Sequence, residues 1–101
     1  MTHRFFVAEH DGRMFFGNSR DEEFHFVALR DGGSTRTLQG TMHRTREDAE
    51  KDAAREPGLF EGPFVAIEEL REVTREEVEE LGAQASSSPD TYREAFRRSF
   101  R

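Results

Sequence analysis

Four histidines and several pairs of adjacent carboxylates are the residues of this sequence that could do acid–base or metal chemistry. No two histidines have a metal-binding spacing, and the absence of cysteine removes thiolate ligands and disulfides. His25 lies between Phe24 and Phe26 in a predicted central strand, so one hypothesis is a small enzyme with His25 as its base. A core or half-buried histidine with a hydrogen-bond partner is the more frequent case. His10 is expected at an exposed hairpin tip.

The carboxylate pairs are typical of solvated faces and loops rather than of a catalytic pair, whose two carboxyl groups need different environments. The sequence also contains no phosphate-binding loop, nucleophile elbow or dinucleotide-binding motif. We therefore predict no catalytic residue, no metal and no cofactor, and we favour a protein that is not an enzyme.

Charge is distributed unevenly along a chain whose net charge is −6. Residues 61–90 hold eight Glu and one Asp against two Arg, a net of −7. A solvated helix face would explain this, and so would an acidic surface that docks on a basic protein. If the surface binds a partner, the residues expected to form it are Glu68, Glu69, Glu72, Glu76, Glu79 and Glu80.

The last eleven residues, 91–101, have the opposite charge, with four Arg against one Glu. A basic tail combined with aromatic residues on a sheet would suit nucleic-acid binding, which is the alternative function. The tail residues that would carry it are Arg93, Arg97, Arg98 and Arg101.

Strand signals fill the first half of the chain. Residues 5–9 and 14–16 flank Asp11-Gly12, the preferred centre of a type I′ hairpin turn. Residues 17–21 have the composition of a loop, and strands are predicted at 24–29 and 35–43. A fifth strand begins at Pro63 and continues through Leu70.

Helix signals follow at Thr45 and Thr74, each of which is a good N-cap. The first helix runs to about Arg55 and presents little more than two alanines, so Leu59 and Phe60 are expected to complete its packing. The second has a capping box and a hydrophobic staple between Val73 and Val78.

The predicted fold class is α+β, with the order β-β-β-β-α-β-α-α. We expect a small antiparallel sheet of four or five strands with two or three helices on one face. Residues 1–88 are predicted to form a single domain, and residues 89–101 a basic amphipathic C-terminal helix or tail. Phe residues point to both faces of the sheet, so either the second face is covered or an apolar patch is left for a partner.

The layout of residues 5–54 resembles that of small antitoxin domains with a partial double-stranded-RNA-binding fold. The segments that carry the resemblance are residues 9–12, 40–41 and 45–50. An extra strand is inserted here and a proline-glycine segment is missing, so the resemblance is one of layout and transfers no residue. Small acidic phage-encoded inhibitors, including anti-CRISPR proteins, are similar in size.

The expected function is therefore that of a non-enzymatic protein-binding module, an inhibitor or adaptor of the phage or mobile-element type. Its partner would be a protein, basic or nucleic-acid-handling. Direct nucleic-acid binding ranks second, a homodimer is left open, and no membrane partner is expected because no apolar stretch is long enough. The expected location is the cytoplasm.

Overall fold

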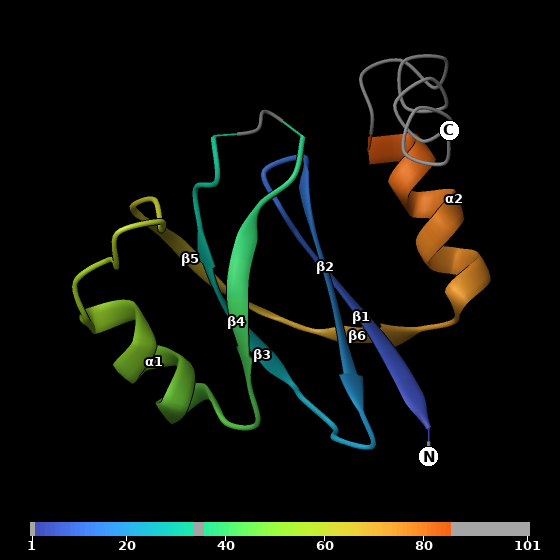
Figure 1. Ribbon diagram of the computed structural model, residues 1–101, viewed down its shortest axis with the longest axis horizontal. Helices are drawn as coiled ribbons and strands as arrows, with labels where there is room; N and C mark the ends of the chain where they lie inside the picture. The colour runs from blue at the N-terminus through green and yellow to red at the C-terminus, as the bar shows by residue number, and fades with distance from the viewer. Residues whose placement is uncertain (1, 34–35, 86–101) are drawn as a thin grey trace.

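The computed structural model describes residues 2–33 and 36–85, which form six strands and two helices (Figure 1). The elements are β1 (His3–His10), β2 (Arg13–Arg20), β3 (Phe26–Arg30), β4 (Gln39–His43), α1 (Arg46–Ala54), β5 (Phe64–Glu69), β6 (Arg71–Val73) and α2 (Arg75–Ala85). The predicted third helix, at 89–101, lies outside the described residues.

The strands form two antiparallel three-stranded sheets, with the orders β2-β1-β6 and β4-β3-β5. The prediction of one sheet of four or five strands was therefore wrong. The strand predicted from Pro63 through Leu70 ends at Glu69, and the N–H of Leu70, which follows it, donates to the carbonyl of His25 at 2.8 Å. This strand, β5, pairs with β3, whereas the next strand, β6, pairs with β1. The predicted strand therefore corresponds to β5 alone, and β6, which was not predicted, lies in the other sheet.

The inner faces of the two sheets pack against each other. Ala8 and Phe15 from the first sheet form one buried cluster with Val27 and Leu29 from the second, and Leu38 completes it. Burial of these apolar side chains is the main stabilising contribution in the centre of the molecule.

The two helices lie on opposite sides of this pair of sheets (Figure 1). Val78 and Leu81 of α2 pack against Val7 and Met14 on the outer face of the first sheet. Helix α1 packs against the second sheet, where Ala28 and Ala49 are fully buried. The prediction of helices on one face was wrong because each sheet already uses one face to pack on the other. Each sheet therefore has only its outer face available for a helix.

Local signals in the sequence were more reliable than the predicted arrangement. The hairpin at Asp11 and Gly12 is confirmed, since both residues have positive φ (53° and 79°). Of the loop predicted at 17–21, residues 17–20 instead belong to β2, which continues to Arg20. Gly17 lies close to two side chains there: a Cβ would lie 2.7 Å from Sδ of Met42 and 2.9 Å from the ring of Phe15, so a larger residue would require one of them to move.

Both helix starts are confirmed by their caps. Thr45 accepts the N–H of Asp48 at 3.1 Å, and Thr74 accepts the N–H of Glu77 at 3.1 Å. The hydrophobic staple is also present, because Val73 and Val78 share one cluster.

Candidate functional site

A group of charged side chains is buried between α1 and the sheet β4-β3-β5. Arg30 and Asp52 are only 3% and 7% exposed. Arg30 lies on the helix-facing side of β3 because Val27 and Leu29, which alternate with Ala28 and Arg30 along the strand, face the inner core. A helix and a sheet usually pack through apolar residues, whereas the interface between α1 and its sheet contains the buried ion pair of Arg30 and Asp52.

Asp52 is the centre of the group. Its Oδ2 accepts a hydrogen bond from Nε2 of His43 at 2.8 Å, and its Oδ1 lies 2.9 Å from Nε of Arg55 and 3.5 Å from Nη2 of Arg30. Burial alone would raise the pKa of this carboxyl, but the hydrogen bond from His43 and the positive charges of Arg55 and Arg30 outweigh it and lower the pKa below 3.8. Asp52 is therefore ionised at neutral pH, and the proton shared with His43 belongs to the imidazole.

Arg30 also binds the last turn of α1. Its Nη2 donates to the backbone carbonyl of Asp52 at 2.7 Å and to that of Arg55 at 3.5 Å. A cation is favourable at this end of a helix, where the carbonyls have no partner within the helix and carry the negative end of the dipole.

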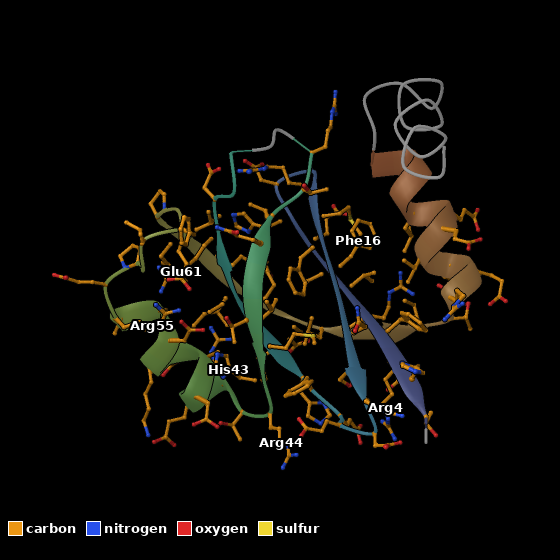
Figure 2. All side chains as sticks on the ribbon, in the orientation of Figure 1. Arg4, Phe16, His43, Arg44, Arg55 and Glu61 are labelled. Atoms are coloured by element: carbon orange, nitrogen blue, oxygen red, sulfur yellow. The ribbon has the colours of Figure 1, made fainter. Side chains whose placement is uncertain are left out.

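Arg55 connects this buried group to the surface (Figure 2). Its Nη1 and Nη2 each donate to one carboxylate oxygen of Glu61 at 2.7 Å, a two-point pairing. The hydrogen bonds from Arg55, together with that from the N–H of Gly58, lower the pKa of Glu61 to about 2. The hydrogen bonds to Glu61, together with the negative charges of Asp52 and Glu61, raise the pKa of Arg55. A continuous chain of charges thus runs from Arg30 through Asp52 and Arg55 to Glu61.

Glu61 closes a tight β-turn, which we call the apolar turn (residues 58–61). The N–H of Glu61 donates to the carbonyl of Gly58 at 3.2 Å, so Leu59 and Phe60 are the two central residues. Both side chains project into solvent, at 90% and 91% exposed. The expectation that they complete the packing of the first helix was therefore wrong.

The segment that follows the apolar turn is anchored as well. Gly62 is so close to the backbone of Asp31 that a Cβ would lie 1.7 Å from its carbonyl oxygen, so another residue would require the chain to move. The N–H of Asp31 donates to the carbonyl of Pro63 at 3.0 Å. The turn is thus held on both sides, by Glu61 and by the contact with Asp31.

Acid should weaken the fold over the range in which Asp52 and Glu61 titrate. Both folded pKa values lie below the ordinary ones of 3.8 and 4.5, so their stabilising contributions are complete above about pH 4.5. Each contribution is lost as the pH falls through the folded pKa, which is about 2 for Glu61. We expect urea unfolding to show that the free energy of unfolding falls as the pH is lowered from about 4.5 to about 2. Glu61→Gln should make the dependence shallower, and an unchanged slope would contradict the pairing with Arg55.

An open hollow of about 410 Å³ lies beside this group, over α1 and β4. Its lining residues are Thr41, His43, Asp48, Lys51, Asp52 and Arg55. Both oxygens of Asp52 and Nε2 of His43 already have partners, so these groups hold one another rather than stand ready for a substrate. Among residues 2–33 and 36–85, no three His, Cys, Asp or Glu side chains come together as a metal site.

The predicted acidic residues do not form one set. Glu68 lies between the sheets, 2.7 Å from Nδ1 of His10, and Glu72 lies 3.3 Å from Nη1 of Arg4. Glu69 is exposed at the end of β5. The remaining three, Glu76, Glu79 and Glu80, are exposed on α2.

The residues of the two alternative hypotheses are placed differently. His25 lies just before β3 with a side chain that is 55% exposed, 3.7 Å from Glu23, and so it is not in a central strand. His10, expected at an exposed tip, is instead half-buried because β1 extends to it and Glu68 pairs with it. The predicted basic tail, Arg93, Arg97, Arg98 and Arg101, lies outside the described residues.

The aromatic residues of the strands are mostly covered. Phe6 and Phe15 are buried between the sheets, and Phe5 and Phe16 pack with α2 on the outer face. The exposed large apolar side chains in the described part of the chain are Leu59, Phe60 and Phe64. An apolar surface therefore exists, but it lies on the apolar turn and at the start of β5, where the sequence did not predict it.

No protein-family model, curated protein or solved structure matches the chain. No helix in the described segments is long and apolar enough to cross a membrane. What the protein does must therefore be inferred from the geometry of its own residues.

Proposed function

We propose that the protein is a non-enzymatic protein-binding module that acts by occupying a partner protein, with the apolar turn as its main contact. The observation that carries the proposal is the exposure of Leu59 and Phe60, at 90% and 91%, in a turn held by the two-point pairing of Glu61 with Arg55. Turn centres are usually occupied by Gly, Pro, Asn, Asp or Ser. Two large apolar side chains there make no contribution to the core and are available to a partner.

The way the turn is held supports a role in binding. Binding energy at protein interfaces is concentrated in a few residues that fill pockets on the partner, and a contact residue that is already fixed loses little entropy when it binds. Full burial of a Leu or Phe side chain is worth roughly 1.5–3 kcal/mol. Leu59 and Phe60 combine a large apolar area with a backbone fixed by Glu61, Gly58 and Gly62.

The charge of the molecule favours a basic partner. The net charge is −6, and part of this negative charge lies on the exposed carboxylates of α2, which are Glu76, Glu79 and Glu80. Such a field raises the rate of association with a positively charged protein more than it raises affinity. In this proposal the apolar turn supplies the affinity and the acidic surface contributes to rate and selectivity.

The proposal is tested by affinity capture from the native host's lysate at moderate salt. We expect a stoichiometric protein to be retained by the native protein and lost by the double variant Leu59→Ser/Phe60→Ser. The control double variant on α2, Glu79→Ser/Glu80→Ser, should lose much less of the captured protein. Retention by the turn variant would contradict the proposal, and a signal that disappears after nuclease treatment would favour nucleic-acid binding instead.

A further inference from the structure

Strand β5 forms an open edge of its sheet. It pairs with β3 on one side, and in the described part of the chain no strand pairs with its other side. An unpaired strand edge presents a row of backbone N–H and C=O groups to which another extended chain can add. Proteins usually protect such an edge with charged residues, proline or a covering element.

The exposed edge of β5 is apolar over four residues. Phe64 is 42% exposed and Ala66 and Ile67 are half-buried, whereas Val65 packs against the central core cluster. The outer strands β2 and β4 are different, because the segment just before β4 pairs with β2: the N–H of Leu38 donates to the carbonyl of Met14 at 2.8 Å, and the N–H of Met14 donates to that of Arg36 at 3.0 Å. The third outer strand, β6, is only three residues long and begins with two charged residues. Of these strands, β5 is the one suited to accept an added strand.

The charges at the two ends of β5 indicate what kind of strand would fit. Glu69, at the C-terminal end, is exposed and has no ion-pair partner among the described residues, whereas Glu68 is engaged by His10. The other end begins with Phe64, directly after the apolar turn. A strand added antiparallel to β5 would therefore place its first residues opposite Glu69 and its later residues near Phe64.

We propose that an extended segment of the partner adds as an antiparallel strand to β5. Its first residues are basic and face Glu69, and apolar residues follow along residues 64–67. This inference rests on the proposed function, since the added strand would end beside the apolar turn. A second copy of this chain fits less well, because residues 61–70 contain Glu61, Glu68 and Glu69 and no Lys or Arg. Its own strand would bring carboxylates and no cation.

The test uses two synthetic peptides of the same length that alternate valine and threonine, one beginning with two lysines and the other with two glutamates. Each is titrated into the native protein while amide hydrogen exchange of residues 64–69 is followed by NMR. We expect the lysine peptide to slow exchange in β5 by about tenfold at saturation. It should bind about fivefold more tightly than the glutamate peptide, the size expected for an exposed ion pair.

Charge reversal supplies the matched control. Glu69→Lys should reverse the preference between the two peptides, whereas Glu79→Lys, the same change on α2, should leave it in place. Unchanged exchange in β5, or an unchanged preference in Glu69→Lys, would overturn the inference. So would a dimer of the protein alone, found by sedimentation, in which the β5 amides are already protected.

The outcome can be separated from that of the proposed function. The peptides test the strand edge without the natural partner, whereas the capture experiment tests the apolar turn with it. If the peptides fail but Leu59→Ser/Phe60→Ser still loses the captured protein, strand addition is wrong and the binding function stands. If the peptides bind but the turn variant retains the captured protein, strand addition to β5 stands and the proposal that the apolar turn is the main contact is wrong.

Discussion

Replacing Asp52 with alanine should lower the free energy of unfolding by about 3–5 kcal/mol, the usual cost of leaving one member of a buried ion pair without its partner. Arg30 is 3% exposed, and its Nε and Nη1 have no hydrogen-bond partner among the described residues. Its positive charge is offset through Nη2, which binds Asp52 and the carbonyls at the end of α1. Removing the Asp52 carboxylate leaves this cation buried and also removes the partner of His43.

Urea denaturation at pH 7 measures this effect, with Glu50→Ala as the control. Glu50 is on the same helix, but it is exposed and its ion-pair partner among the described residues is Arg46 at 3.4 Å, so its loss should cost less than about 0.5 kcal/mol. If Asp52→Ala does not fold, Asp52→Asn keeps the shape of the side chain and should show the same direction with a smaller loss. A loss from Asp52→Ala no larger than that from Glu50→Ala would show that the buried charges do not hold α1 on the sheet.

Replacing Leu59 and Phe60 together with serine should weaken binding of the captured partner by at least about 100-fold. Truncating an interface residue that carries binding energy costs about 2 kcal/mol or more, so two such residues should cost about 4 kcal/mol. A 100-fold loss of affinity corresponds to about 2.8 kcal/mol, which is less than this sum. The free energy of unfolding should change by less than about 0.5 kcal/mol, because both side chains are exposed.

Isothermal titration with the purified partner checks this prediction, and urea denaturation of the same variant separates binding from folding. Glu79→Ser/Glu80→Ser serves as the control for surface substitution and should change mainly the rate of association. Equal losses of affinity in the two double variants would argue against the apolar turn as the principal contact.

The sequence predicted the elements better than their assembly. Hairpin and cap signals are local, so Asp11-Gly12, Thr45 and Thr74 could be recognised from their neighbours alone. The division into two sheets instead arises from long-range strand pairing, in which β5 pairs with β3 and β6 pairs with β1. No local signal marks β6 (Arg71–Val73) or the change of sheet before it, so the strands were assigned to one sheet and the helices to one face.

The candidate site was missed for a related reason. Asp52 lies three residues after Ala49 and so on the same face of α1, but an acidic residue at that position is normally assigned to solvent. Its burial depends on Arg30, which is 22 residues earlier in the sequence and on a different element. The thin apolar face of the helix was the available signal, because a helix with two small apolar residues needs other contacts to stay on its sheet.

The apolar turn was missed because sequence periodicity applies to helices and strands and not to loops. Glu56, Pro57 and Gly58 correctly predicted the end of the first helix, which stops at Ala54. Leu59 and Phe60 were then assigned to the core on hydrophobicity alone. Their outward position follows from the pairing of Glu61 with Arg55, which no local signal indicates.

The backbone order parameter of residues 58–61 in the free protein, obtained by NMR relaxation, reports whether the apolar turn is fixed before a partner binds. If the pairing of Glu61 with Arg55 holds the apolar turn ready for a partner, the native values should be about 0.85, as in the strands, and Glu61→Gln should lower them in the turn alone. Native values below about 0.6 would show that the turn is mobile before binding, and would contradict the account.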